Sequence, residues 1–356
     1  MEIVFVCTRS ITFNTFLKSQ AEYLLKKGFK VKVVCADNEN LDFKKSLSYK
    51  IYFPTKYIHL FNITNYYKIF FQIRKLVKNN KSSVFYLHTP IASYLFRMFS
   101  ISYNIKLVYF VHGFRFTSKT NFIKSFFFKT IENILSFKTN VIITINEEDL
   151  SYAKKKFVNK SQIYKLNGVG LDKLKNNSKI FKLKKNIKKI LVIGAYKKSK
   201  GYYEVLKIAE FLKEYSIKVE CFGYGDIKKF QNIKTKKNLN NLILNKFDMN
   251  LKKKIKSYDL LLHLSNREGL PVSVMECLSE GLPVICKEIR GNNDLIVNKF
   301  NGFFVKSYKE AVYKILYLNM ENTTFNKMRN NAFNSITEKF SKKNINNEIY
   351  KILRKI

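Results

Sequence analysis

The stretch REGLPVSVMECLSEGLPVIC, residues 267–286, decides the fold of its half of the chain. The chain has only 12 glycines and 4 prolines. Even so, Gly269, Pro271, Gly281 and Pro283 all fall here, so the backbone geometry is specified most tightly at this point. Pro271 suits the first position of a helix, because the N–H group that proline lacks would be unpaired there anyway. The stretch therefore predicts a loop, then a helix that starts at Pro271, then a buried strand.

The start of this predicted helix is suited to bind an anion. Gly269 lets the preceding loop come close to a ligand. The N–H groups of the first turn, near Val272 and Ser273, carry the positive end of the helix dipole, which favours a diphosphate. Glu268 lies before the helix and Glu276 in its second turn, and a carboxylate accepts the two hydrogen bonds that a ribose diol or a pair of sugar hydroxyls offers. The alternative is an ordinary strand, loop and helix with two solvated glutamates.

Short apolar, strand-like runs alternate with helical segments along the whole chain. This alternation predicts parallel strands joined by right-handed crossovers, which form doubly wound α/β sheets. The runs in the first half are EIVFV (2–6), FKVKVV (29–34), SVFYLH (83–88), KLVYFVH (106–112) and NVIITIN (140–146). Those in the second half are KILVIG (189–194), IKVECFG (217–223), LILNKF (242–247), DLLLHLS (259–265) and PVIC (283–286). His88, His112 and Asn146 end three of these runs, where open α/β sheets place their ligands.

The strand–helix rhythm is interrupted over the charged and weakly periodic residues 171–188, which we interpret as a linker. We therefore expect an N-terminal Rossmann-like domain over 1–170 and a C-terminal one over 189–338, facing each other across a cleft. The last segment, 339–356, carries apolar residues at helical spacing and predicts an amphipathic closing helix. A plain packing helix explains the same spacing.

The chain is strongly basic, with 66 Lys and Arg residues against 26 Asp and Glu residues and a formal charge of +40. A field of this size favours binding to nucleic acid, to anionic lipid headgroups or to phosphorylated substrates. A merely solvated basic surface is the alternative. Because 46% of the residues are hydrophobic and 15% are aromatic, the composition excludes a disordered chain.

Cysteine usage and hydropathy indicate where the protein works. The five cysteines form no CxxC pair, which indicates a reducing compartment and no metal site. Residues 2–6 resemble a first strand rather than a signal peptide. No uncharged apolar run approaches the roughly 18 to 20 residues of a membrane-spanning helix. We therefore expect a cytoplasmic protein that lies on the inner face of the plasma membrane without crossing it.

Two segments predict how the chain meets that membrane. YYKIFFQIRKLVKNNK (66–81) and FIKSFFFK (122–129) interleave Phe, Ile or Leu with Lys and Arg. A helix of this composition lies in the interface, with its rings among the lipid headgroups and its lysines at anionic phosphates. The alternative is a core-facing helix whose lysines are solvated.

Several motifs together resemble one known family. The pattern E-x7-E with an internal G-L-P, followed by E-x-G-x-P-V, resembles the signature of retaining glycosyltransferases of the GT-B fold, family 4. The next segments, KEIRGNNDLI (287–296) and NGFFV (301–305), also resemble that family. The first half is similar to the exopolysaccharide and capsule branch in LHTPIASYL (87–95), YFVHGFRF (109–116), ITINEEDLSYAKK (143–155) and NGVGLD (167–172).

The resemblance implies roles for particular residues. Glu276 holds the ribose hydroxyls, and Glu268 faces the donor sugar. His112 matches the N-domain histidine that approaches the sugar and its phosphate, so His112 and Glu268 are the expected catalytic residues. The loop and helix start that contact the sugar and the diphosphate consist of Gly269, Leu270, Pro271 and Val272.

The other histidines carry weaker signals. For His88 a functional and a structural role both stay open. His59 and His263 are expected to be structural, because a lone histidine in apolar text is more often part of a core than of a site.

The resemblance also implies a basic pair that neutralises the leaving diphosphate, an Arg near the end of the domain's first strand and a Lys shortly after it. Lys200, directly before Gly201, matches the Lys. The Arg position falls on or near Ala195, so Lys197 or Lys198 is left to replace it, although a lysine cannot form the bidentate fork of an arginine. We expect Lys198 and Lys200 to bind the donor.

The function implied by the resemblance is transfer of a sugar, with retention, from a UDP-linked nucleotide-sugar to a polyprenyl-diphosphate-linked surface glycan such as capsule or lipopolysaccharide. No DxD motif is present, which favours catalysis without a metal or other cofactor. The expected partners are the donor, the lipid-linked acceptor and an anionic membrane, but not nucleic acid. The alternatives are a sugar-nucleotide epimerase or hydrolase on the same fold, or a basic nucleic-acid-binding protein, for which no RRM, KH, zinc-finger or helix-turn-helix signature is visible.

Overall fold

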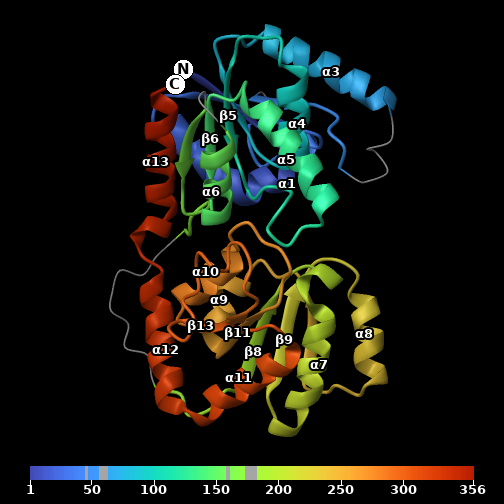
Figure 1. Ribbon diagram of the computed structural model, residues 1–356, viewed down its shortest axis with the longest axis vertical. Coiled ribbons are helices and arrows are strands. Elements are labelled where there is room, and N and C mark those ends of the chain that lie inside the picture. Colours follow the sequence, from blue (N-terminus) through green and yellow to red (C-terminus); the bar gives the residue numbers. More distant parts are fainter. Residues whose placement is uncertain (45–46, 56–62, 158–160, 173–182) are drawn as a thin grey trace. The chain divides into compact units, whose positions relative to one another are not determined.

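The computed structural model describes residues 1–44, 47–55, 63–157, 161–172 and 183–356 (Figure 1). The chain forms two compact units, each with its own parallel sheet. Unit 1 consists of Met1–Gly170 and Lys342–Ile356, and unit 2 of Leu171–Ser341. Residues 173–182 of the predicted linker lie outside the described residues, as does His59.

In the described part of unit 1, seven parallel strands pair in the order β3-β2-β1-β4-β5-β6-β7. The strands are β1 (Glu2–Val6), β2 (Lys30–Cys35), β3 (Ser48–Lys50), β4 (Val84–Leu87), β5 (Lys106–Phe110), β6 (Val141–Thr144) and β7 (Gln162–Lys165). The helices are α1 (Ser10–Thr12), α2 (Lys18–Lys26), α3 (Ile63–Lys78), α4 (Pro90–Phe99), α5 (Phe122–Ser136), α6 (Glu147–Lys156) and α13 (Lys342–Arg354). Strands β4 and β6 are buried along their whole length, as expected for a parallel sheet covered by helices.

In the described part of unit 2, six parallel strands pair in the order β10-β9-β8-β11-β12-β13. The strands are β8 (Lys189–Ile193), β9 (Lys218–Gly223), β10 (Leu242–Lys246), β11 (Leu260–His263), β12 (Val284–Cys286) and β13 (Gly302–Phe304). The helices are α7 (Tyr202–Leu212), α8 (Ile227–Lys236), α9 (Leu251–Lys254), α10 (Val272–Ser279), α11 (Tyr308–Met320) and α12 (Asn322–Ser335).

The strand order reverses at one point in each sheet. The first strands of the units, β1 and β8, pair on one side with β2 and β9 and on the other side with β4 and β11. Open α/β sheets bind their ligands at the carboxyl ends of the strands where the order reverses. The predicted class, α/β with two Rossmann-like domains, is therefore confirmed, and the topology points to one edge of each sheet.

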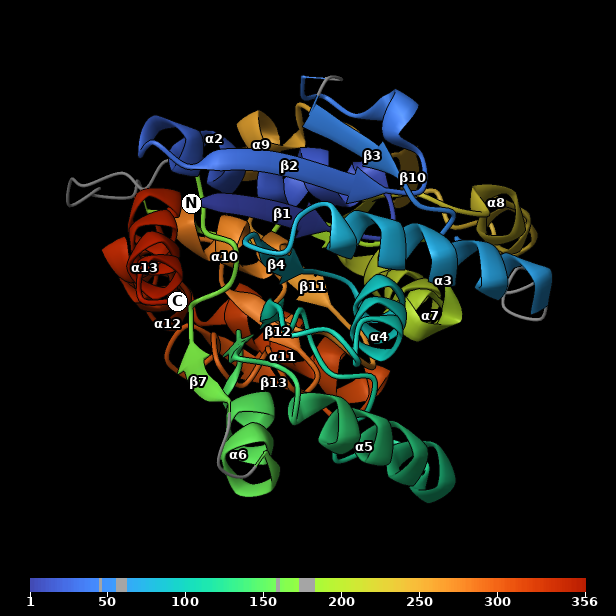
Figure 2. The same ribbon diagram turned by 90° about the horizontal axis from the view of Figure 1, so that it is seen from above.

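Helices α3, α4 and α5 lie next to one another on one side of unit 1 (Figures 1 and 2). A buried ion pair fastens α5 to α4. Arg97 and Glu132 are both fully buried, with Nη2 and Oε2 2.8 Å apart. The guanidinium group also lies 4.1 Å from the ring centre of Tyr109 on β5. The inner face of α5 is thus fixed to the core of the unit.

Helix α13 belongs to unit 1, although it follows unit 2 in the sequence. It packs against α2, and the rings of Phe29 and Tyr350 meet edge to face at 5.7 Å. The apolar stripe predicted for residues 339–356 is buried at Ile345, Ile349 and Leu353. This stripe is a packing face.

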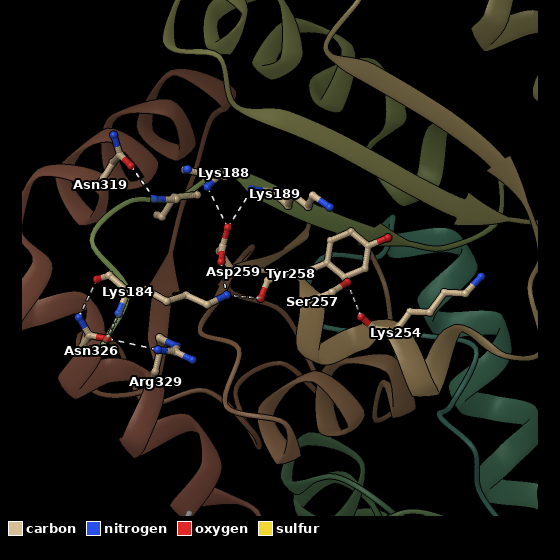
Figure 3. Close-up of polar contacts among 11 residues, drawn as sticks. Lys184, Lys188, Lys189, Lys254, Ser257, Tyr258, Asp259, Asn319, Asn326 and Arg329 are labelled. Atoms are coloured by element: carbon tan, nitrogen blue, oxygen red, sulfur yellow. Dashed lines mark hydrogen bonds and ion pairs between the residues drawn. The ribbon is translucent and has the colours of Figure 1, made fainter. Parts of the chain in front are cut away.

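Asp259, directly before β11, holds the segment that leads into β8 (Figure 3). Its Oδ2 atom accepts the backbone N–H groups of Lys188 and Lys189, both at 2.8 Å. Its Oδ1 atom pairs with Nζ of Lys184. Residues 183–188 of the predicted linker are therefore built into unit 2.

Candidate functional site

Helix α10 starts one residue later than the sequence predicts. Pro271 is the N-cap, with φ −73° and an extended ψ of 113°, and the first helical residue is Val272. The carbonyl oxygen of Pro271 accepts the N–H groups of Val274 at 3.1 Å and Met275 at 3.2 Å. The N–H groups of the first turn still form the end of the helix that attracts an anion.

The loop before α10 is held by a turn that follows β12. Gly291 has a φ of +80°, and a Cβ atom there would lie 2.3 Å from the carbonyl oxygen of Gly269, so only glycine permits this packing. The buried Arg290 donates from Nε to the carbonyl oxygen of Glu268 at 2.9 Å. Leu270 is buried, so its side chain packs in the core and only its backbone is left to a ligand.

Glu268 lies in a cluster with Lys200 and His263, which come from distant segments. Its Oε1 atom is 2.6 Å from Nζ of Lys200 and 3.4 Å from Nε2 of His263. Burial raises the pKa of Glu268, but the proximity of His263 and then of Lys200 outweighs burial and brings the pKa to about 2. The group is therefore a carboxylate at neutral pH, suited to accept hydrogen bonds and not to donate a proton.

A tight turn after β8 delivers Lys200 to this carboxylate. Residues Lys198–Lys200 form one 3₁₀ turn, and Gly201 follows with a φ of +79°. A Cβ atom at Gly201 would lie 2.5 Å from the carbonyl oxygen of Leu264, so glycine lets the turn pack on the end of β11. The structure thus brings Lys200 and Glu268 together at the point of unit 2 where the strand order reverses.

Lys198 lines a pocket of its own beside this turn. The pocket has a volume of about 360 Å³. It is lined by Lys198, Gly201, Tyr203, Glu204, Asn266 and Lys287. Lys287 pairs with Oε2 of Glu204 at 2.6 Å. The lining of this pocket includes Lys198 but neither Lys200 nor Glu268.

Glu276 lines another pocket along α10, with a volume of about 230 Å³. Its Oε1 atom lies 2.7 Å from Nζ of Lys252, which also lies 3.3 Å from Oδ2 of Asp172. The pocket is lined by Leu171, Asp172, Lys252, Ile255, Glu276, Ser279 and Glu280. This arrangement offers carboxylate oxygens around one lysine, which suits a ligand rich in hydroxyl groups.

In unit 1 the histidines lie at the corresponding carboxyl edge, directly after β4 and near the end of β5. Nδ1 of His88 and Nε2 of His112 are 3.1 Å apart. Burial lowers the pKa of His112 to about 4, so its ring is neutral at physiological pH. The structure therefore places His88 in contact with the predicted catalytic histidine.

Asn146, at the end of the third such strand, has a structural role. Its Oδ1 atom accepts the N–H group of Asp149 at 2.8 Å and caps α6. Its Nδ2 group donates to Oδ2 of Asp149 at 2.9 Å.

All five cysteines are buried and unbridged. Among the described residues, no three His, Cys, Asp or Glu side chains gather in a way that would hold a metal ion.

Sequence reasoning missed three residues that hold the predicted carboxylates. His263 was expected to be structural, but it contacts Glu268. Lys252 sits in the run KKK of a lysine-rich chain, which gives no signal for one particular lysine. Arg290 lies after β12, within the segment 287–296 that resembles the family, and this position is the signal that could have identified it.

Two family comparisons match this architecture. Residues 3–146 match the family described as "Glycosyl transferase 4-like", and residues 174–335 match "Glycosyl transferases group 1". Among solved structures, the chain is similar to the Anabaena protein HepE in complex with UDP and glucose. The TM-score is 0.77 at 14% identity, and the match covers 100% of both chains. The fold therefore defines a glycosyltransferase of the GT-B class.

Curated relatives agree with this class. The chain is 24% identical over 353 residues to the UDP-Gal:alpha-D-GlcNAc-diphosphoundecaprenol alpha-1,3-galactosyltransferase of Escherichia coli, covering 90% of this chain and 87% of the relative. It is 25% identical over 262 residues to the putative glycosyltransferase EpsD of Bacillus subtilis, covering 69% of each. The two family matches together span most of the chain, which belongs to the family-4-like glycosyltransferases of the GT-B fold, as predicted.

Proposed function

We propose that this glycosyltransferase moves a sugar from a UDP-linked donor to a polyprenyl-diphosphate-linked glycan, with retention of the anomeric configuration. The observation that carries the proposal is the cluster of Glu268, Lys200 and His263 beside the start of α10. The name of the E. coli relative gives a UDP-galactose donor and a diphosphoundecaprenol-linked acceptor, which supports both substrate classes.

The donor's charges and hydroxyl groups match the groups around α10. We assign the diphosphate to the first-turn N–H groups of α10 and to Lys200, because both attract anions. Glu276 accepts the ribose hydroxyls in its pocket. Lys252 binds Oε1 of this carboxylate and orients it. Glu268 accepts hydroxyl groups of the sugar.

Departure of the diphosphate is the step that needs stabilisation. In this proposal the helix dipole and Lys200 take the negative charge that develops on the leaving group, so no metal ion is required. Glu268 stays ionised because its pKa is about 2, and it favours positive charge that develops on the sugar ring. We assign no covalent nucleophile. His112 is neutral and contributes a hydrogen bond beside the reacting sugar.

The acceptor class requires the enzyme to work at a bilayer surface. The outer face of α5 exposes Phe122, Phe126 and Phe127, with the exposed Lys124 between them. Phe122 is 81% exposed. The outer face of α3 similarly exposes Tyr67 and Phe71 among lysines. Exposed rings interleaved with cations suit an anionic membrane interface, and with the net charge of +40 they support peripheral docking on the cytoplasmic leaflet.

Phe128 is packed differently from these exposed rings. Phe128 is only partly exposed and stacks at 6.4 Å on Tyr94 of α4, so it belongs to the packed face of α5. Among the described residues, no helix is both long and apolar enough to cross a membrane.

Donor binding tests the proposal directly. Calorimetry with UDP, GDP and ADP should show binding to UDP that Lys200→Met weakens, because the charge facing the diphosphate is lost. Lys237→Met is the matched control, since Lys237 forms an exposed pair with Glu210 in the last turn of α7. If no nucleoside diphosphate binds, or if both variants bind UDP as the parent does, the assignment of the donor site is wrong.

A further inference from the structure

We propose that His88 is a positioning residue that fixes the tautomer of His112, so that His112 presents an Nδ1–H donor to the reacting sugar. The inference rests on the proposed function, because it takes His112 to act beside the donor. The contact that carries it is the 3.1 Å separation between Nδ1 of His88 and Nε2 of His112. One of these two nitrogens donates and the other accepts.

The surroundings of His88 decide which nitrogen donates. His88 is fully buried, and its Nε2 atom has no hydrogen-bond partner among the residues that the structure describes. Its ring stacks on Phe5 at 5.7 Å with an interplanar angle of 7°, and it meets Tyr86 at 4.2 Å and Phe110 at 5.5 Å. The imidazole is thus enclosed by aromatic rings.

If His112 donated, the proton of His88 would sit on Nε2 as a buried N–H group without an acceptor. Buried N–H groups without an acceptor are rarer in proteins than buried acceptors without a donor. His88 therefore carries its proton on Nδ1 and donates it to Nε2 of His112. Burial lowers the pKa of both histidines, so each ring holds one proton. The proton of His112 must then sit on Nδ1.

The backbone at this corner is built to hold the ring of His88. Thr89 has a φ of +63°, which a β-branched residue adopts only when its surroundings force it. Its Oγ1 atom accepts the N–H group of Thr8 at 3.0 Å and donates to the carbonyl oxygen of His88 at 2.6 Å. The N–H group of His88 donates to Val6 at 2.7 Å. Strain of this kind is characteristic of functional sites.

The chemical consequence concerns what the donor sugar meets. An Nδ1–H group on His112 donates a hydrogen bond to a sugar or phosphate oxygen. The opposite tautomer would present a lone pair and could only accept. Where each imidazole nitrogen has a fixed role as donor or acceptor, a neighbouring group commonly holds the histidine in one tautomer.

Nitrogen NMR reads this tautomer without any substrate. The chain has four histidines, so ¹⁵N-histidine labelling gives a spectrum in which each ring is resolved. At neutral pH we expect His112 with a protonated Nδ1 and an unprotonated Nε2. In His88→Leu, His112 should shift towards the Nε2–H form that imidazoles prefer in water. A wild-type protein in which His112 is protonated on Nε2 overturns the proposal. This measurement needs no variant, so it decides the question even if His88→Leu does not fold.

A matched pair of variants tests the consequence for turnover. Leu and Asn have nearly the same shape, but Asn places an N–H donor where Nδ1 of His88 lies. His88→Leu should lower kcat about tenfold or more while the donor Kd stays within about twofold, and His88→Asn should recover most of kcat. Equal loss of kcat in both variants overturns the proposal, because the ring would then serve only in packing. Failure of the proposed function appears separately, as absence of UDP binding with the histidine spectrum unchanged.

Discussion

At the scale of single residues, the candidate donor site consists of carboxylates that neighbouring side chains already hold in place. Lys200 and His263 contact Glu268, and Lys252 contacts Glu276. These contacts orient each carboxylate before a ligand arrives, and a pKa of about 2 keeps Glu268 ionised. A sugar nucleotide therefore meets preorganised acceptors, which lowers the reorganisation that catalysis would otherwise require.

Replacement of Glu276 tests the ribose assignment. Glu276→Ala should weaken donor binding by about 1.5 to 3 kcal/mol, or roughly 10- to 150-fold, because a charge-assisted hydrogen bond is lost. Thermal unfolding should change little, since the side chain lines a pocket. Glu210→Ala, which removes a surface carboxylate of α7, is the control. Calorimetric affinities that are the same in both variants would rule out the ribose role.

The pair His88 and His112 predicts how stability depends on pH. The unfolded chain protonates His112 near pH 6.5, whereas the folded chain keeps it neutral down to a pKa of about 4. The unfolded state therefore binds more protons in this window, and the free energy of unfolding falls as the pH drops from about 6.5 to about 4. His112 accounts for up to about 3 kcal/mol of this loss, and His88 acts in the same direction.

Urea unfolding at about pH 7 and about pH 5 measures this dependence. His112→Asn should lose less stability than the parent between the two pH values, because one titrating group has been removed. An identical pH dependence in parent and variant would show that His112 is not held neutral by burial.

The two carboxylates and Lys200 could be predicted from the sequence, but the contacts of Lys252, His263 and Arg290 could not. Glu268 and Glu276 belong to one local pattern, in which the helix start fixes their spacing. Lys252, His263 and Arg290 come from three separate segments, which only the folded unit brings next to Glu276 and Glu268. In a chain with 66 basic residues, charge alone does not single them out.

At the scale of elements, the inner and outer faces of α5 have different roles. The inner face is fixed by Arg97 and Glu132, which are both fully buried. The outer face exposes Phe122, Phe126 and Phe127. A helix with so apolar an outer surface needs a firm anchor on its inner side to keep those rings from turning into the core. The buried ion pair provides that anchor.

Breaking this pair should destabilise unit 1. Arg97→Met leaves Glu132 buried without its partner and should cost about 3 to 5 kcal/mol of unfolding free energy. The double variant Arg97→Met/Glu132→Leu should recover most of that loss, because no uncompensated charge remains. Lys237→Ala, at an exposed pair, should cost less than about 1 kcal/mol. Denaturant unfolding measures all three, and a single variant as stable as the parent would refute the anchoring role.

The outer face of α5 predicts binding to anionic membranes. The protein should sediment with anionic liposomes, bind neutral ones weakly, and be released as salt screens the charges. Replacing Phe122, Phe126 and Phe127 with Ser should weaken this binding and leave UDP affinity unchanged. Phe211→Ser, at a half-exposed ring of unit 2, is the matched control. Equal sedimentation with neutral and anionic vesicles, or none with either, would reject electrostatic docking.

The alternation of strands and helices was predictable because long buried strands leave continuous apolar runs. The short edge strands Ser48–Lys50, Gln162–Lys165 and Gly302–Phe304 were not predicted as strands, since runs of three or four residues are too short to show a periodicity. The association of α13 with unit 1 was also missed. Its apolar stripe indicates that it packs, but not against which unit.

At the scale of the whole molecule, a glycosyltransferase fold is combined with a strongly basic surface. The fold and the family follow from both units. The charge of +40 suits an enzyme whose donor carries a diphosphate and whose acceptor sits among anionic lipids. In the proposed function, the donor, the acceptor and the membrane all carry phosphate groups that cationic side chains attract.

Transfer of a sugar to a lipid-linked acceptor is the central claim, and mass spectrometry of the acceptor tests it most directly. The purified protein is incubated with UDP-sugars and a polyprenyl-diphosphate-linked sugar, with and without EDTA. The account predicts that the acceptor gains the mass of one sugar residue, only when donor and acceptor are both present and equally well in EDTA. Release of free sugar or an epimerised donor in the absence of acceptor would contradict it, and loss of transfer in EDTA that Mg²⁺ or Mn²⁺ restores would contradict its metal-independent chemistry.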